Sequence, residues 1–397
     1  MDKEKLDKLL AEGAKLLAKS GKTVKRFAIS TLIPEKWLID EENEWDVRLD
    51  GKSESVKNQL NREISEFLEK KTKKEYSPSD ADVRVVFDLS GTKNPVKIEF
   101  EPLFVFGRYK KLIPEISQSR WICSKCEGDG CFKCDWKGKF YESVEEFIGD
   151  PLKEACKAKD YALHASGRED TDVVNLAGRP FVLELKAVKN HSPDLKKIAE
   201  KINKPKKVSV SDLKIVKRGF VEAVTESHFD KEYTAEVEFE KEVTEEELAK
   251  IAGLKGVVIE QQTPKRVMHR RADLVRKRKI VELKILNRSD DGKTTKVAIT
   301  AEAGTYIKEL INGDGGRTKP SFAGILGFGA KCKKLIVSRI YDEFLDVILR
   351  TESIPKGDSE GEYSRAFRDS LARSRQDAKN GRTHDIEEVK KKLIKKK

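Results

Sequence analysis

Four cysteines within twelve residues form the clearest chemical pattern in this sequence. Cys123, Cys126, Cys131 and Cys134 make two Cys-x-x-Cys pairs separated by four residues. Four thiolates at about 2.3 Å around one ion give the closed tetrahedral arrangement of a structural zinc site. The other two cysteines are isolated, which favours a metal site in a reducing compartment over a disulfide framework. A redox pair and chance clustering are the alternatives.

A second candidate is a carboxylate that follows a glycine turn. The segment Gly167-Arg168-Glu169-Asp170 comes directly after a predicted strand, where a glycine can expose the side chains that follow. A carboxylate can act as a nucleophile in covalent catalysis. Asp172 is a rival two residues later. Taken alone this segment is weak evidence, because an aspartate after a strand is usually a turn former.

Three further segments carry groups of chemical interest. They are Lys231-Glu232-Tyr233 in an alternating run, Gly304-Thr305-Tyr306-Ile307-Lys308 at a predicted helix entry, and the basic run 262–271. The ordinary interpretations are a half-buried sheet tyrosine, a solvated lysine and a solvated surface. A basic run also suits contacts with phosphates.

Several common chemistries lack their sequence signatures. The chain has no Gly-x-x-x-x-Gly-Lys-Ser/Thr phosphate loop and no Gly-x-Gly-x-x-Gly dinucleotide turn. It also has no Gly-x-Ser-x-Gly elbow and no His-Glu-x-x-His helix. ATP-driven, hydride-transfer and protease functions are therefore disfavoured.

The elements that must position these residues divide the chain into four parts. Residues 1–116 predict an α+β domain, with helices at 1–21 and 53–72 and strands at 27–33, 82–89 and 96–106. The cysteine knuckle occupies 117–141. Residues 142–350 predict a mixed, mainly antiparallel sheet flanked by helices. Its helices are expected at 142–158, 194–203, 244–252 and from 305, and its strands at 161–165, 181–187, 233–243, 280–286, 294–301 and 332–341. Residues 351–397 predict a polar, basic tail.

Composition points to a polyanionic partner. Charged residues make up 38% of the 397 residues and the net charge is +12, whereas about a quarter is usual. Such an excess typically marks nucleic acid binding, and the alternative is a surface adapted to heat or salt. No run approaches the ~20 apolar residues of a membrane span. We therefore expect a cytoplasmic protein that contacts no membrane.

Taken in order, these segments resemble the archaeal and eukaryotic tRNA pseudouridine synthases that act on uridines 54 and 55 of the TΨC arm. The resemblance covers roughly residues 80–345. It rests on the motifs at 106–112, 117–121, 143–147, 165–170, 178–181, 262–271, 303–310 and 315–320, with the cysteine knuckles between the second and third. Any one of these motifs would be weak evidence for the family, but the complete set in this order is highly specific for it.

The resemblance implies a fold and a set of residue roles. It implies an N-terminal RNA-binding domain of the THUMP type followed by a pseudouridine synthase catalytic domain. Asp170 would be the nucleophile, Tyr233 the active-site tyrosine and Lys308 the cation that pairs with the aspartate. Arg168 is a second candidate for that cation, and Tyr306 belongs to the motif that carries Lys308.

The same resemblance implies the partners. The substrate would be the TΨC arm of tRNA, whose target nucleotide must be flipped out at a cost of a few kcal/mol. Stacking on Tyr233 would recover ~1–3 kcal/mol, and Arg266, Arg270 and Arg271 would contact phosphates. The reaction needs no catalytic cofactor, so the expected metal is structural Zn²⁺ alone.

Other functions are still open at this stage. A non-catalytic, zinc-containing tRNA-binding protein would keep the basic runs without needing Asp170. Another THUMP-type tRNA-modifying enzyme would need a cofactor turn or nucleotide loop, and neither is visible. The tail is either a solvated, RNA-attracting segment or a site for a protein partner.

Overall fold

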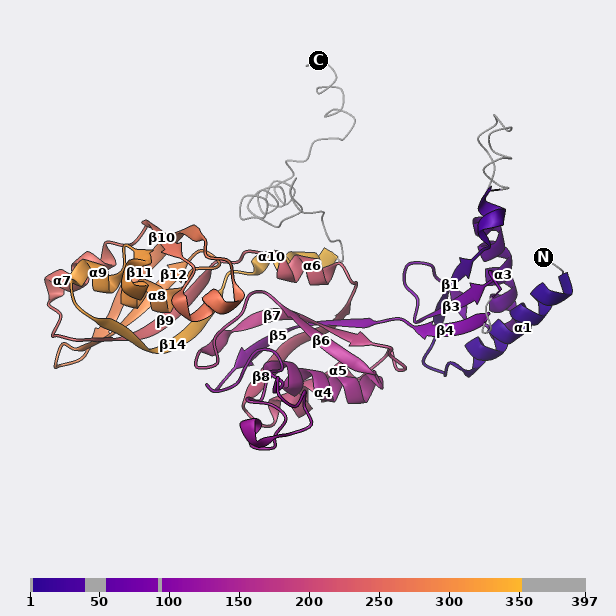
Figure 1. The fold of residues 1–397 in the computed structure, drawn as a ribbon, viewed down its shortest axis with the longest axis horizontal. Helices are drawn as coiled ribbons and strands as arrows, with labels where there is room; N and C mark the ends of the chain where they lie inside the picture. Colours follow the sequence, from indigo (N-terminus) through magenta and orange to yellow (C-terminus); the bar gives the residue numbers. More distant parts are fainter. Residues whose placement is uncertain (1–2, 40–54, 92–94, 352–397) are drawn as a thin grey trace, which may run out of the picture.

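The computed structural model describes residues 3–39, 55–91 and 95–351 (Figure 1). The predicted tail, and with it the predicted protein partner, falls on residues outside this part of the chain. No described helix is both long and apolar enough to cross a membrane.

The N-terminal elements form a small sheet covered by two helices. Strand β1 runs parallel to β2 and β3, and β3 pairs antiparallel with β4. The predicted helices at 1–21 and 53–72 are present, and their leucines pack with Phe27 and Phe87 in one apolar cluster. The elements are α1 (Lys3–Lys19), β1 (Arg26–Leu32), α3 (Val56–Thr72), β2 (Glu75–Tyr76), β3 (Val83–Asp88) and β4 (Val96–Phe100).

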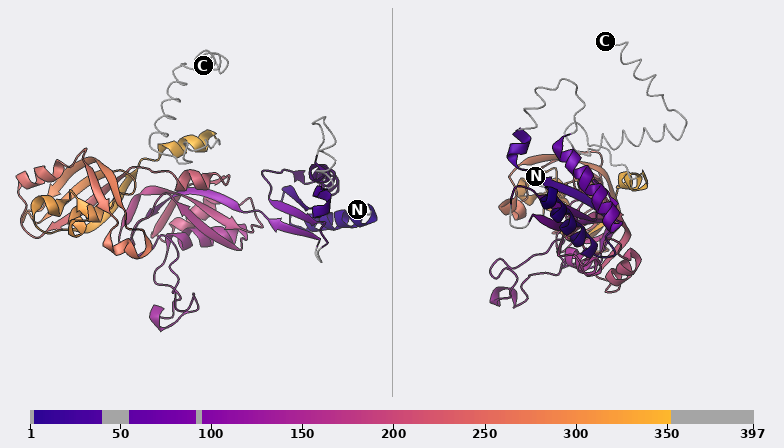
Figure 2. Two further views of the ribbon diagram at one scale, coloured as in Figure 1. Left: turned by 45° about the horizontal axis from the view of Figure 1, so that its top comes forward. Right: turned by 90° about the vertical axis from the view of Figure 1, so that its right-hand side faces the viewer.

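A second group of elements forms one half of a ten-stranded sheet. Helices α4 and α5 pack against it around Phe181, Leu183 and Val208, which are fully buried. The elements are β5 (Leu103–Lys111), α4 (Val144–Cys156), β6 (Asp160–Ala165), β7 (Val174–Lys186), α5 (Leu195–Asn203) and β8 (Val208–Val216). The cysteine segment lies between β5 and α4 and projects away from the central strands, as the left view in Figure 2 shows.

The remaining elements form the other half of that sheet and its covering helices, except that α6 and α10 contact strands of the first half (Figure 1). Helix α7 begins with the predicted capping box, in which Thr244 and Glu247 each accept from the other's backbone N–H. The elements are α6 (Phe220–Thr225), β9 (Lys231–Phe239), α7 (Glu245–Ala252), β10 (Val258–Gln262), η2 (Lys265–Arg270), β11 (Val275–Arg288), β12 (Thr294–Ala301), α8 (Ile307–Asn312), η3 (Gly313–Gly316), β13 (Thr318–Lys319), α9 (Phe322–Leu326), β14 (Ala330–Ile340) and α10 (Glu343–Thr351).

One parallel contact joins the two halves of the large sheet. The strand order is β13-β10-β11-β12-β9-β14-β7-β5-β8, with β6 paired to β7. Strand β14 runs parallel to β7 where Ile336 faces Val174, and the other described pairs in this sheet are antiparallel. The predicted mixed sheet flanked by helices is therefore confirmed.

The expected strand at 96–106 is in fact two strands in two different sheets. Strand β4 ends at Phe100, whereas β5 pairs with β7 and β8. The break falls at Glu101-Pro102, because proline has no N–H to donate to a ladder. The chain thus changes sheet about fifteen residues before the predicted division at 116, and the domain limits themselves stay a prediction.

Candidate active site and metal centre

Seven of the residues singled out in the sequence line one cleft where the two halves of the large sheet meet. The cleft has a volume of about 460 Å³. The seven are Arg168, Asp170, Tyr233, Arg266, Arg271, Tyr306 and Lys308. The side chain of the eighth, Arg270, lies outside the described part of the structure.

The loop between β6 and β7 carries Asp170. Gly167 begins the loop with φ +77°, and a side chain there would approach the buried Arg179 guanidinium at 3.2 Å. Glycine adopts this conformation without steric cost. The loop therefore needs a glycine at this position to bring the aspartate to the cleft.

Two cations contact the Asp170 carboxylate. The Arg266 guanidinium donates to one oxygen at 2.8 Å, and the Lys308 ammonium lies 3.4 Å from the other. Lys308 also donates to both Asp172 oxygens at 2.7 Å. Burial acts to raise the pKa of Asp170, but the charges of Arg266 and Lys308 outweigh it, so the pKa lies below its usual value. The carboxylate is therefore ionised at neutral pH.

Arg266 is fixed from its other side by a buried carboxylate. Its Nε donates to Glu309 at 2.7 Å, and Glu309 is 4% exposed. Arg168, the second candidate cation, is exposed and makes no ion pair with Asp170 in the described structure. The basic run predicts phosphate contacts for Arg266, whereas the structure places this side chain against Asp170.

A buried polar network lies behind the loop. Glu169 accepts from the Tyr109 hydroxyl at 2.7 Å and lies 2.6 Å from Arg179. The Gln118 amide donates to the Tyr109 hydroxyl at 2.8 Å and to the Gly167 carbonyl at 2.9 Å. Because both charges of the Glu169–Arg179 pair are removed from water, the pair needs good geometry to persist. The network fixes the start of the loop against β5 and β7.

Lys111 fixes the other end of the same loop. Its side chain is fully buried, and its ammonium donates to the carbonyls of Ile116, Asp170 and Thr171, each at 2.9 Å. Burial lowers the pKa of Lys111 to about 8, against the opposing charges of nearby carboxylates. One side chain thus ties the backbone of Asp170 to the segment that leads into the cysteine knuckle.

Two tyrosines form part of the cleft wall. Tyr233 comes from β9, and burial raises its pKa to about 12, so its hydroxyl is neutral at physiological pH. The backbone N–H and carbonyl of Tyr306 pair with the side-chain amide of Gln261 at 2.9 and 3.0 Å. The Tyr306 hydroxyl accepts from Arg271 at 3.1 Å. Both rings are therefore placed by neighbouring strands.

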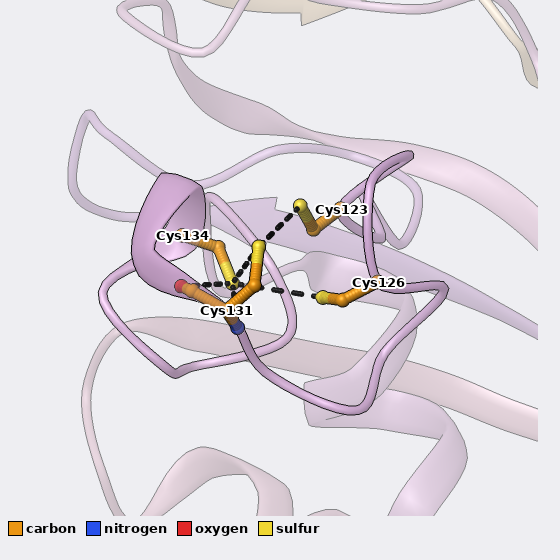
Figure 3. Close-up of side chains that lie close together, drawn as sticks. All are labelled: Cys123, Cys126, Cys131 and Cys134. Atoms are coloured by element: carbon orange, nitrogen blue, oxygen red, sulfur yellow. Dashed lines mark hydrogen bonds between the residues drawn. The ribbon is translucent and has the colours of Figure 1, made fainter.

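The four clustered cysteines converge on one point (Figure 3). Their sulfurs lie within 4.8 Å of one another, and the pairs Cys123–Cys131, Cys126–Cys134 and Cys131–Cys134 are each 3.8 Å apart. A tetrahedron with metal–sulfur bonds of about 2.3 Å has edges of about 3.8 Å. The thiols therefore fit one tetrahedral metal ion and leave no open coordination position.

The surroundings of the sulfurs suit thiolate ligands. The backbone N–H of Gly130 donates to the Cys126 sulfur at 3.3 Å, and that of Cys131 donates to the Cys134 sulfur at 3.2 Å. Such donors stabilise the negative charge of metal-bound sulfur. Among the described residues this is the single group of three or more His, Cys, Asp or Glu that meets the geometric requirement for a metal ion.

The comparisons with known proteins agree with one another. The family model for the C-terminal region of Pus10 matches residues 104–341. The tRNA pseudouridine synthase Pus10 of Methanopyrus kandleri is 40% identical over 330 residues, covering 80% of this chain and 74% of the relative. The enzyme of the same name from Archaeoglobus fulgidus is 41% identical over 294 residues, covering 73% and 80%. That from Methanocaldococcus jannaschii is 40% identical over 347 residues, covering 87% and 74%.

Solved structures give a weaker likeness. A Cbf5-Nop10-Gar1 complex contains a chain that is 19% identical, with a TM-score of 0.32 and 53% of each chain covered. A score of that size carries no argument about function. The sequence relatives, by contrast, match over most of both chains. The chain therefore belongs to the Pus10 family and is a pseudouridine synthase, an isomerase.

Proposed function

We propose that this enzyme isomerises uridine 54, uridine 55 or both in the TΨC arm of tRNA, with Asp170 as its nucleophile. The observation that carries the proposal is the partly exposed Asp170 carboxylate, kept ionised by Arg266 and Lys308 inside a cleft. The relatives named above are tRNA pseudouridine synthases, which supports tRNA as the substrate class.

The reaction exchanges one glycosidic bond for another. The N1–C1′ bond breaks, the uracil turns, C5 bonds to C1′, and the proton lost from C5 is balanced by one gained at N1. No electron is gained or lost overall, so the reaction requires no redox partner. An ionised Asp170 serves each of three routes: attack at C1′, attack on the uracil ring, or removal of a sugar proton.

The cleft supplies the other requirements of this reaction. A stacked nucleotide must leave its helix to reach Asp170, at a cost of a few kcal/mol. Tyr233 and Tyr306 offer aromatic faces to a flipped base, worth ~1–3 kcal/mol per stacked base. Arg168, Arg270 and Arg271 are assigned to the phosphates around it.

We also propose the roles of the accessory parts. The four cysteines bind one structural Zn²⁺, supported by the sulfur spacing and the absence of an open coordination position. The N-terminal sheet and its helices serve as an RNA-binding domain of the THUMP type. Reduced cysteines suit an enzyme that works in the cytoplasm.

Incubation with an unmodified tRNA transcript tests this function directly. Pseudouridine should form at position 54, 55 or both, and not in a matched transcript with cytidine at both positions. Tight binding without pseudouridine would instead favour the non-catalytic RNA-binding alternative. Pseudouridine confined to another position would refute the assignment to the TΨC arm.

A further inference from the structure

The tip of the cysteine knuckle exposes two large aromatic side chains. Phe132 is 86% exposed and Trp136 is 75% exposed, the two highest values among the large hydrophobic residues that the structure describes. Both lie on the segment that projects from the central strands (Figure 2). Isolated exposed apolar residues are common, but two aromatic rings four residues apart on one small projection suggest a binding surface.

The knuckle fixes the backbone that presents Trp136. This tryptophan has φ +62°, a conformation that costs energy for a residue with a side chain. Its N–H donates to the Cys131 carbonyl at 2.9 Å, and Gly130 approaches so closely that a side chain there would lie 2.7 Å from the Trp136 carbonyl. The ring is therefore directed outward by the same turns that bring the cysteines together.

Exposed lysines flank both rings. Lys133 follows Phe132 and Lys137 follows Trp136, and both lysines are exposed. Aromatic rings beside cationic side chains are the usual composition of a surface that binds single-stranded nucleic acid. Exposed acidic residues lie on the same projection, and one of them, Asp135, directly precedes Trp136. The two lysines therefore offer single cationic contacts and not a continuous positive surface.

The base of the knuckle contacts the loop that carries Asp170. The Glu115 N–H donates to the Thr171 carbonyl at 2.8 Å, and the Gln118 amide donates to the Gly167 carbonyl at 2.9 Å. A ligand bound at the tip would therefore be fixed relative to the cleft.

We propose that the knuckle tip is a second RNA contact, in which Phe132 and Trp136 stack on unpaired bases of the substrate while Lys133 and Lys137 contact phosphates. This inference rests on the proposed function, because it takes RNA as the substrate. Unpaired bases are the partner that fits, since paired bases keep their faces stacked inside a helix. The tip acts in binding and leaves the chemical step to the cleft.

The double variant Phe132→Ala/Trp136→Ala tests the proposal on the full chain. Stacking is worth enough per base that the Kd for an unmodified tRNA transcript should rise about tenfold or more. KM should rise with it, while kcat at saturating tRNA stays within about twofold of wild type. The single variant Trp136→Phe should keep most of the wild-type affinity for tRNA, because phenylalanine keeps a stacking face.

Matched controls separate loss of stacking from loss of fold. Leu286→Ala removes an apolar side chain that is 54% exposed on β11, far from the knuckle in the fold, and should leave the Kd unchanged. Metal content and thermal midpoint of the double variant should equal those of the wild type. A blunt RNA duplex without loops should bind wild type and double variant equally, since it offers no unpaired base.

Salt dependence tests the lysines separately. Lys133→Gln/Lys137→Gln should reduce the slope of log Kd against log salt by about 0.7 per lost phosphate contact. The aromatic double variant should keep the wild-type slope, because stacking releases no counterions.

The outcomes distinguish the two proposals. If wild type forms pseudouridine in the transcript but the double variant binds tRNA as tightly as wild type, the knuckle inference is wrong and the proposed function stands. That result would also be expected if the tip docks a protein instead. If the wild-type protein neither binds nor modifies tRNA, the proposed function is wrong, and the knuckle inference that rests on it is wrong as well. A reduced kcat with an unchanged Kd would overturn the inference as well.

Discussion

Replacing Lys111 by methionine should destabilise the loop that carries Asp170. The lysine ammonium is the shared donor for the Ile116, Asp170 and Thr171 carbonyls, each at 2.9 Å. Methionine has a similar length and no donor, so it removes the three hydrogen bonds with little change in shape. The loop should then lose its fixed position relative to the cations that face Asp170.

The size of the effect follows from two opposing terms. A buried carbonyl without a donor costs about 1–3 kcal/mol, which gives about 3–9 kcal/mol for three. The Thr171 carbonyl keeps the Glu115 N–H at 2.8 Å and the Asp170 carbonyl keeps the Val173 N–H at 3.2 Å, so the Ile116 carbonyl alone loses its described donor and a cost of about 1–3 kcal/mol applies. Burial lowers the pKa of Lys111 to about 8, which means that the charged form is disfavoured by about 3 kcal/mol in the fold, and methionine relieves this cost. The two terms nearly cancel, so the free energy of unfolding should change by less than about 2 kcal/mol, and the main effect should be on the position of the loop and therefore on the reaction rate.

Lys110→Met is the matched control for this variant. Lys110 precedes Lys111 on β5 but points to the opposite, exposed side. Urea unfolding midpoints give the stability difference, and single-turnover rates at saturating tRNA give the effect on chemistry. Lys111→Met should reduce the rate at least about tenfold without changing the Kd for tRNA, whereas Lys110→Met should change neither rate nor stability.

Equal behaviour of the two variants would refute this reasoning. If both unfold at the same urea concentration and react at the same rate, the three hydrogen bonds of Lys111 do not position the loop. A loss of tRNA affinity in Lys111→Met with an unchanged single-turnover rate would assign the lysine to binding instead.

Three further predictions concern the same residues and the metal centre. Arg266→Gln should raise the pKa of Asp170, because the cation lowers it, so the acid limb of the single-turnover rate should move to higher pH; an unmoved limb would contradict this electrostatic role. Replacing Cys123 and Cys126 by serine should release about one zinc per chain, measured by elemental analysis, and lower the thermal midpoint; unchanged metal content would disprove the zinc assignment. Because the folded pKa of Lys111 lies below the unfolded one, the folded state binds fewer protons between about pH 8 and the ordinary lysine pKa. The stability of wild type relative to Lys111→Met should therefore rise with pH across that window, and a fall would refute the sign.

The sequence predicts the parts of the site that depend on close spacing along the chain. The cysteines can be recognised because their spacing alone places four sulfurs together. The Gly167-to-Asp170 segment is weak evidence by itself, and the role expected for Asp170 comes from the ordered set of motifs that carries the resemblance. The helices at 53–72 and 244–252 were predicted because their apolar residues repeat at helical spacing and, in the second, a capping box marks the start.

Of the contacts between distant segments, the resemblance implies the pairing of Lys308 with Asp170, whereas the others were not predicted. Arg266 lies 96 residues from Asp170, in a basic run whose composition equally suits a solvated surface. Lys110 and Lys111 are chemically identical neighbours. Side chains alternate along a strand, so the two lysines must face opposite sides of the sheet, but the sequence does not indicate which side is buried. Strand β8 is not predicted because Asp212, at φ +58°, interrupts the alternation of apolar and polar residues where the pairing with β5 shifts register.

A comparison of Asp170→Asn with Asp172→Asn measures the central claim most directly. The two carboxylates lie on one loop and both contact Lys308. Comparing the two variants therefore separates the loss of the nucleophile from a general disturbance of the loop. Pseudouridine in an unmodified tRNA transcript, quantified under single-turnover conditions with saturating enzyme, should be abolished by Asp170→Asn with the Kd for tRNA nearly unchanged. Asp172→Asn should still turn over. Normal turnover by Asp170→Asn, or loss of turnover confined to Asp172→Asn, would contradict the assignment of Asp170 as the nucleophile.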